Sequence, residues 1–146
     1  MRASARWSSA IAAAWAGVLI GIAALAAPAA FATLATADAG RVVGRLLTLE
    51  AWLSLVVALL LFFIERQRAQ QAADGGAGSV FSTEMLLLLG TIFCTVAGHF
   101  AIEPMMAAAR LGQGDWSFGA LHATSSAFFA AKGLLVLALV WRFGRR

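Results

Sequence analysis

Charge is scarce in this sequence, and that scarcity decides the class of protein. Charged residues make up 12% of the chain and hydrophobic residues 62%, whereas globular domains carry about 25% charged residues. A chain of 146 residues has too much surface for its volume to bury so much apolar area around one aqueous core. The sequence therefore predicts an integral membrane protein, with the lipid bilayer as its main partner.

Several sites are excluded because their residues are missing. The single cysteine, Cys94, rules out an internal disulfide and a cysteine-rich zinc site. No glycine-rich phosphate loop, nucleophile elbow or HExxH motif occurs, so we expect a protein that is not an enzyme and has no cofactor. The basic residues form no stripe interleaved with aromatic residues, so nucleic acid is not an expected partner.

Four long apolar runs predict the fold. Each run is long enough to cross a hydrocarbon core of about 30 Å, which indicates an all-α, polytopic four-helix transmembrane bundle forming a single domain over residues 1–146. The expected helices cover about residues 8–31, 46–64, 83–103 and 118–141. Between the second and third helices, residues from about 66 to 80 are rich in Gln, Ala, Gly and Ser, which predicts a flexible cytoplasmic loop.

The first run has two interpretations. Basic residues before it and an alanine-rich end are typical of a secretory signal peptide, but its apolar stretch from Ile11 to Ala27 exceeds the usual 7–15 residues. We expect it to be retained as a membrane helix, and sequencing the mature N-terminus would distinguish the two. Gly17 and Gly21 form a small-residue face, which suggests association with a membrane-protein partner or a homo-oligomer.

Arginine placement predicts the orientation, because basic residues favour cytoplasmic loops. With four helices, one side of the membrane holds seven arginines, namely Arg2, Arg6, Arg66, Arg68, Arg142, Arg145 and Arg146. The other side holds three, namely Arg41, Arg45 and Arg110. Both termini are therefore expected in the cytoplasm (N-in/C-in), and the protein in the bacterial inner membrane as a multi-pass protein.

This topology gathers most ionisable side chains of the apolar runs near the periplasmic interface. The candidate polar or binding cluster comprises Arg41, Arg45, Glu50, His99, Glu103, His122, Ser125 and Lys132. Two interpretations stay open: a hydrogen-bonded cap that ties the helices together, or a functional site, since ionisable residues inside a membrane are functional candidates. Cys94 lies about 140° round a regular helix from His99, so we expect it to contribute to packing only.

A metal site is a weaker hypothesis. Imidazole and carboxylate ligands suit zinc or iron, and the candidates are His99, Glu103 and His122. They are few, and only two of them share a helix, four residues apart.

Lys132 is the most costly residue of the chain. It lies ten residues before Arg142, about 15 Å along a helix, which is too deep to reach the interface. A lysine at the centre of a bilayer costs about 2.5–3.5 kcal/mol, so it should face a partner. We consider Glu84, Glu50, backbone carbonyls or the carboxylate of a ligand, and alternatively a role in a proton or anion path.

Two segments carry a family resemblance. The first is Pro28–Ala29–Ala30–Phe31 followed by residues 39–47, and the second is Glu103–Pro104 with Arg110 and then residues 118–126. Together they resemble the bacterial four-helix proteins of domain of unknown function 4149, related to eukaryotic transmembrane protein 205. The resemblance implies that the positions of this chain to carry over from the family are Pro104, His122, Ser125 and the pair Gly44–Arg45. The chain departs from the family at residues 47–50 and at Phe129.

The family's activity is not established, and its eukaryotic member is associated with resistance to platinum drugs. Our leading hypothesis is therefore a non-enzymatic accessory protein or small binding module with a polar site at the periplasmic face. The alternative is a small transporter or a metal- or drug-resistance protein that uses His99, Glu103, His122 and Lys132.

Overall fold

A computed structural model describes residues 2–76 and 78–145, without the side chains of residues 2–5. Arg146 and Ala77, the latter inside the predicted loop, lie outside the described residues. The described chain is helical, and its elements in order are α1 (Arg2–Gly21), η1 (Ile22–Ala26), α2 (Ala27–Thr33), α3 (Thr36–Asp74), α4 (Thr83–Thr95), η2 (Val96–Ala101), α5 (Ile102–Arg110) and α6 (Phe118–Gly144). The two η elements are π-helical turns within continuous helices.

Among the described residues, four helical spans are long and apolar enough to cross a membrane: Arg6–Thr33, Thr36–Asp74, Thr83–Arg110 and Phe118–Gly144. The predicted all-α bundle of four membrane-spanning helices is thus confirmed. Large apolar side chains on the outside, such as Leu25, Val56 and Leu134, are exposed, as expected for residues that face lipid. The protein is a multi-pass membrane protein.

The second span is much longer than the predicted 46–64. It begins at Thr36 and ends at Asp74, so the predicted loop is wrong for residues 66–74, and Arg41 and Arg45 lie in a helix rather than in a loop. The reason is that Gln, Ala and Arg are good helix formers even where the sequence is polar. The helix ends at Gly75 and Gly76, and Gly76 has a φ of 75°, which favours glycine.

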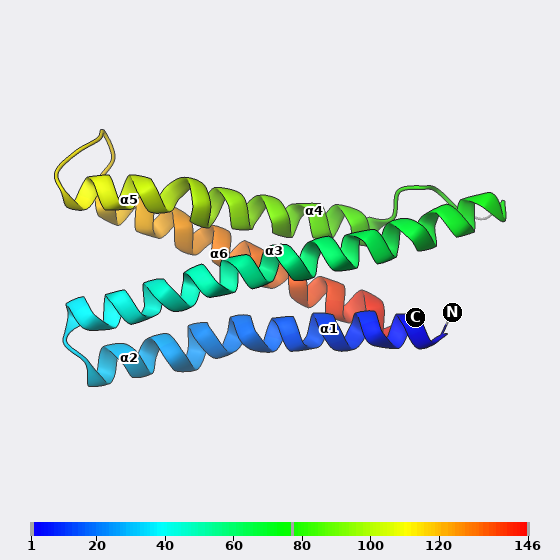
Figure 1. The fold of residues 1–146 in the computed structure, drawn as a ribbon, viewed down its shortest axis with the longest axis horizontal. Helices are drawn as coiled ribbons and strands as arrows, with labels where there is room; N and C mark the ends of the chain where they lie inside the picture. The colour runs from blue at the N-terminus through cyan, green and yellow to red at the C-terminus, as the bar shows by residue number, and fades with distance from the viewer. Residues whose placement is uncertain (1, 77, 146) are drawn as a thin grey trace.

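The chain forms two helical hairpins. The N-terminal hairpin is residues 2–74 and the C-terminal hairpin is residues 83–144. Both termini lie at one end of the bundle, together with the connection between the hairpins, and the two tight connections inside the hairpins lie at the other end (Figure 1). We call this second end the outer end. Helix starts near the connections are capped by Ser82 and Ser117, whose hydroxyls accept from backbone N–H groups three residues on.

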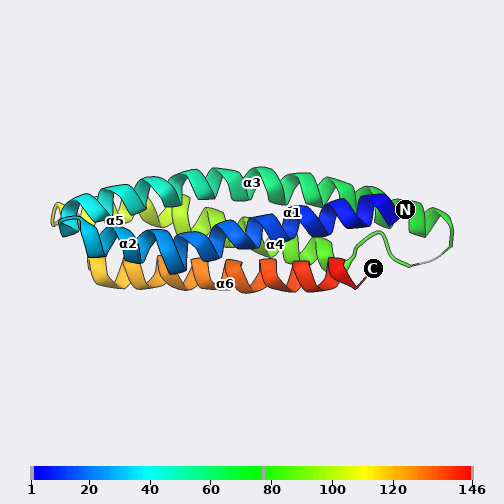
Figure 2. The same cartoon turned by 90° about the horizontal axis from the view of Figure 1, so that it is seen from below.

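Helices α3 and α6 occupy opposite sides of the bundle, with α1 and α4 between them (Figure 2). Seen from the front, α3 and α6 cross near their middles (Figure 1). On the side of the termini, α1 packs along α6 and α4 packs along both α3 and α6. The main apolar core lies there, around Trp15, Leu61, Leu88 and Leu139.

Towards the outer end the bundle separates into two arms. In the N-terminal arm α2 packs on the start of α3, and in the C-terminal arm α5 packs on the start of α6. Over the described residues, α2 does not pack on α6, nor α5 on α3. The two arms are visibly apart in Figure 1, and this separation shapes the site described below.

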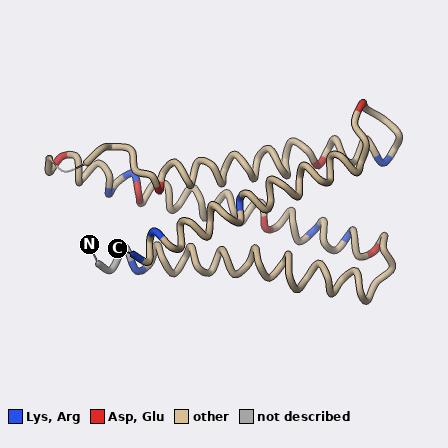
Figure 3. The backbone as a smooth tube through the Cα atoms, turned by 180° about the vertical axis from the view of Figure 1, so that it is seen from behind, with Lys and Arg blue, Asp and Glu red and all other residues tan. Residues whose placement is uncertain are grey.

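Charged side chains are concentrated at the two ends of the bundle, with one exception near its middle (Figure 3). At the end that holds the termini, Arg142 Nε donates to the buried Glu84 at 2.7 Å, and Arg68 donates to the buried Glu65 at 2.5 Å. Glu84, a possible partner for Lys132 on sequence grounds, is therefore engaged at a different level of the bundle.

The two prolines of the chain account for the two π turns. Pro28 and Pro104 each lie just after a π segment. A proline inside a helix donates no hydrogen bond to the carbonyl four residues earlier, and its ring crowds that carbonyl. The carbonyls concerned belong to Ala24 and Phe100, both inside the π segments. The wider turn accommodates Pro104, and the helix continues to Arg110.

Candidate functional site

The exception in the middle of the bundle is an ion pair between Glu50 and Lys132. Lys132 Nζ lies 2.9 Å from one carboxylate oxygen of Glu50 and 2.7 Å from the other, and both residues are only 3% exposed. Lys132 stands near the middle of α6, and Glu50 stands on α3, which faces it across the bundle. We call these two residues the central ion pair.

A second hydrogen-bond chain holds the carboxylate of Glu50 in place. Ser54 Oγ, one turn along α3, donates to Glu50, and Trp15 Nε1 donates to Ser54 Oγ at 2.8 Å. Both Ser54 and Trp15 are buried. Because a buried charge needs both a counter-ion and hydrogen bonds, this chain joins α1, α3 and α6 into one polar network inside an apolar bundle.

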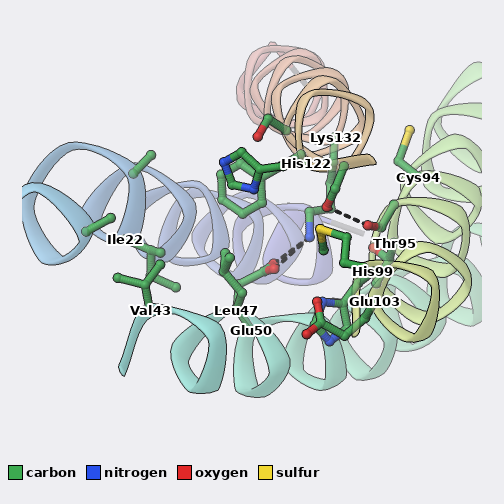
Figure 4. A pocket seen from close by; sticks show the side chains of 17 residues that line it. Ile22, Val43, Leu47, Glu50, Cys94, Thr95, His99, Glu103, His122 and Lys132 are labelled. Carbon is green, nitrogen blue, oxygen red and sulfur yellow. Dashed lines mark hydrogen bonds and ion pairs between the residues drawn. The ribbon is translucent and has the colours of Figure 1, made fainter. Parts of the chain in front are cut away.

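A cavity of about 200 Å³ lies between the two arms, on the side of the central ion pair that faces the outer end. It is lined by Glu50, Lys132, His99, Glu103, His122 and Ser125 among others. Figure 4 shows that the imidazole of His99 lies beside the carboxylate of Glu103, with His122 across the cavity on α6. Six of the eight residues of the predicted cluster therefore line one cavity.

The two arms contribute residues to this cavity at corresponding positions, which indicates an internal repeat. From the first helix of each hairpin, three lining residues lie six, five and one residues before the proline, and the C-terminal hairpin adds Cys94, Thr95 and Met106 without counterparts. These pairs are Ile22 and Gly98, Ala23 and His99, and Ala27 and Glu103.

The second helix of each hairpin follows the same rule. Counted from the starts of α3 and α6, three lining residues of each helix lie seven, eleven and fourteen positions on, and α6 adds His122 and Ser126. These pairs are Val43 and Ser125, Leu47 and Phe129, and Glu50 and Lys132. The central ion pair thus joins two equivalent positions of the two hairpins. No repeat was expected from the sequence.

The depth of the site differs from the prediction. The sequence placed Glu50 at the outer start of a helix that begins near residue 46, but α3 begins at Thr36. Fourteen residues correspond to about 21 Å of helix, so Glu50 lies deep in the bundle. The site is therefore a cavity that reaches from the outer half to the centre, and not a shallow polar cap.

Cys94 also lines the cavity, against the expectation that it lies on a different face from His99. The reason is the π turn of η2. One extra residue in a turn changes the helix register by about 100°, which reduces the expected separation of Cys94 and His99 from about 140° to about 40°. The same turn exposes the carbonyl of Gly98, which accepts from Ser125 Oγ at 2.7 Å.

Gly98 allows the C-terminal arm to pack closely. A Cβ atom at this position would lie 2.4 Å from the Cβ of Phe128 on α6, which is too short for two carbon atoms that are not bonded to each other. The corresponding position of the N-terminal hairpin is Ile22, so this close packing occurs in one hairpin only. It brings η2 against α6 and sets the distance between His99 and the residues of α6.

Aromatic contacts support the walls of the cavity. The ring of His122 stacks on the ring of Phe118, with centroids 5.8 Å apart. The guanidinium of Arg110 lies over the ring of Phe118, 4.7 Å from its centroid. Lys132 Nζ lies 5.1 Å from the ring centroid of Phe129. Glu103, Glu50 and Lys132 line the same cavity as His99.

Arg41 and Arg45 do not join this cluster, which corrects the prediction. Both lie in the first turns of α3 and are exposed, and Arg41 pairs with Asp38 on the surface. Because α3 begins before these residues, their side chains follow the helix surface away from the cavity. The Gly44–Arg45 pair taken from the family resemblance likewise has only Gly44 partly buried.

The metal hypothesis finds no support in the geometry. His99, Glu103 and His122 line the same cavity, but within residues 2–76 and 78–145 no three His, Cys, Asp or Glu side chains gather closely enough to hold a metal ion. His122 lies on the opposite helix and is stacked on Phe118.

Sequence reasoning missed the apolar wall of the cavity, including Ala27, Val43 and Leu47. Apolar residues in a transmembrane helix carry no signal of their own. The two prolines were the available signal, because the equal spacing of Glu50 and Lys132 appears only once α3 is known to start at Thr36.

Comparison with known proteins supports the family resemblance. No curated protein and no solved structure showed significant similarity to the chain. The family model of the domain of unknown function DUF4149 matches residues 10–114, which include most of the first helical span, the whole of the second and third, and most of the cavity's residues. The relation to transmembrane protein 205 stays a prediction. The match covers most of the chain, and the protein therefore belongs to the DUF4149 family.

Proposed function

We propose that this protein is a non-enzymatic binding module of the bacterial inner membrane, which holds a small amphipathic molecule in the cavity between its arms. The observation that carries this proposal is the central ion pair. A buried pair that served only to join helices would be sealed by packing, whereas Glu50 and Lys132 form the floor of a cavity. Ligand sites of this type combine apolar walls with a few fixed polar groups.

The π turns support the same proposal. Single π turns within helices are frequent at functional sites, and both of them contribute lining residues, among them Ile22 and His99. The arginine distribution favours a periplasmic outer end, which would open the space between the arms to the periplasm. The accessory role that we also expected would use the surface around Gly17 and Gly21, whose Cα atoms have open space beside them.

Native mass spectrometry of the protein released from its own membranes tests the binding role. We expect a small-molecule adduct on the wild-type protein that is lost in Ala27→Phe, because the new ring fills the cavity. The matched control is Ala13→Phe, on the exposed surface of α1, which should keep the adduct. Equal adducts on all three proteins would place the molecule outside the cavity and contradict the proposal.

Transport is the second candidate function. It is favoured by the internal repeat, because transporter sites often lie between repeats and are formed by interrupted helices. Reconstituted liposomes would test it: flux of the bound molecule that depends on Lys132 supports transport, and flux unchanged by Lys132→Met removes it.

A further inference from the structure

One carboxylate that lines the cavity has no ion-pair partner among the described residues. The carboxylate of Glu50 is neutralised by Lys132. Glu103 is half-buried in the wall and forms no ion pair within the described residues. Arg110, on the same helix, is engaged with the ring of Phe118 instead.

The internal repeat shows that this charge is confined to one wall. The positions that correspond to His99 and Glu103 in the N-terminal hairpin are Ala23 and Ala27. The C-terminal hairpin thus contributes a polar wall and the N-terminal hairpin an apolar wall, which continues with Val43 and Leu47. A ligand that fits both walls has one polar end and one apolar side, and it binds in a single orientation.

Electrostatics and size define its chemical class. In a site of low dielectric constant a carboxylate attracts a cation and repels an anion much more strongly than it does in water. A cavity of about 150 Å³ holds one benzene ring, so about 200 Å³ suits one ring or a short chain with a small polar group.

We propose that the cavity binds a small amphipathic cation, with its ammonium group at Glu103 and its apolar body against Ala27, Val43 and Leu47. This inference rests on the proposed binding function and specifies the ligand class of the same site.

Three probes of nearly equal shape test the charge preference: benzylammonium, benzyl alcohol and benzoate. Binding is measured by isothermal titration calorimetry at pH 7 on the protein in phosphatidylcholine nanodiscs, with subtraction of empty nanodiscs. Benzylammonium should bind at least about tenfold more tightly than benzyl alcohol, since hydrogen bonds to charged groups are worth about that factor or more. Benzoate should bind most weakly.

The variant Glu103→Gln keeps the shape of the side chain and removes its charge. It should lower the affinity for benzylammonium by about tenfold or more and leave that for benzyl alcohol unchanged, which also shows that the variant is folded. The matched control is Asp115→Asn, an exposed carboxylate in the outer connection, which should alter neither affinity.

The outcomes separate the two proposals. Binding of benzyl alcohol without any preference for benzylammonium, or a preference that survives Glu103→Gln, would overturn the cation inference and leave the binding function standing. Binding of benzoate above the other two would also overturn it. If none of the three probes binds, both proposals fail for ligands of this size.

Discussion

Glu50 and Lys132 stand fourteen residues from the starts of α3 and α6, and their side chains meet at 2.7 Å in the middle of the bundle. The backbones of these two helices are not packed against each other, so the ion pair bridges them through its own side chains. Two equivalent positions with opposite charges therefore add a polar link to the apolar core that joins the two hairpins.

Breaking this pair should destabilise the protein strongly. Glu50→Gln or Lys132→Met leaves an uncompensated charge in the bundle and should cost about 3–5 kcal/mol of unfolding free energy, measured by denaturant titration in detergent. The charge-exchanged double variant Glu50→Lys with Lys132→Glu should recover much of the loss, because the positions are equivalent. The control Asp38→Asn, in the exposed pair with Arg41, should cost less than about 1 kcal/mol.

The hydroxyl of Ser54 should matter through its two partners. Ser54→Ala leaves Trp15 Nε1 buried without an acceptor and removes a donor from Glu50, which should cost about 1–3 kcal/mol in the same titration. Thr124→Ala is the comparison, since that hydroxyl is exposed and bonds only to the backbone of its own helix. An equal loss of unfolding free energy in both variants would show that the buried hydrogen bonds from Trp15 to Ser54 and from Ser54 to Glu50 add no more stability than an exposed hydroxyl does.

Gly98→Ala should loosen the C-terminal arm. The added Cβ would overlap the Cβ of Phe128 at 2.4 Å, so η2 and α6 must separate, at a cost of about 1–3 kcal/mol. Gly133→Ala, where a Cβ meets nothing within 4 Å, should be neutral or stabilising because alanine is the better helix former. Thermal unfolding monitored by circular dichroism checks both, and a stable Gly98→Ala protein would contradict the close packing.

The two prolines should differ in their effect on binding although they are structurally equivalent. Replacing Pro104 with Ala removes the cause of the π turn that presents His99. Replacing Pro28 with Ala removes the cause of the other π turn, which presents Ala23. We expect Pro104→Ala to weaken benzylammonium binding clearly more than Pro28→Ala, measured by calorimetry in nanodiscs. Similar losses in both variants would mean that the turns act through arm geometry rather than through the residues they present.

The orientation can be tested with single cysteines in a Cys94→Ala background. Gln113→Cys lies in the outer connection and Ser79→Cys in the connection between the hairpins. A membrane-impermeant maleimide added to intact spheroplasts should label the first and not the second, because the arginine distribution predicts a periplasmic outer end. Labelling of the Ser79→Cys variant alone would show that the orientation is the opposite of the predicted one.

The sequence was sufficient for the four spans and for most of the polar residues of the cavity, because apolar length and buried charge are strong signals in a membrane protein. It was insufficient for the helix register, that is, for which face of its helix and which depth in the bundle each residue occupies. The π turn moved Cys94 onto the same wall as His99, and the early start of α3 placed Glu50 deeper and Arg41 on the surface. The repeat stayed hidden because its connections differ in length and its paired residues, such as Ala23 and His99, differ in type.

The close contact at Gly98 makes the two halves mechanically unequal. In the C-terminal hairpin Gly98 meets Phe128 and Gly90 meets Leu135, whereas Gly17, Gly21, Gly40 and Gly44 of the N-terminal hairpin have open space beside them. At these two glycines the C-terminal hairpin is packed more closely than the N-terminal hairpin is at any of its own. We therefore expect lateral pressure from the surrounding lipids to change the volume of the cavity mainly by displacing its apolar wall.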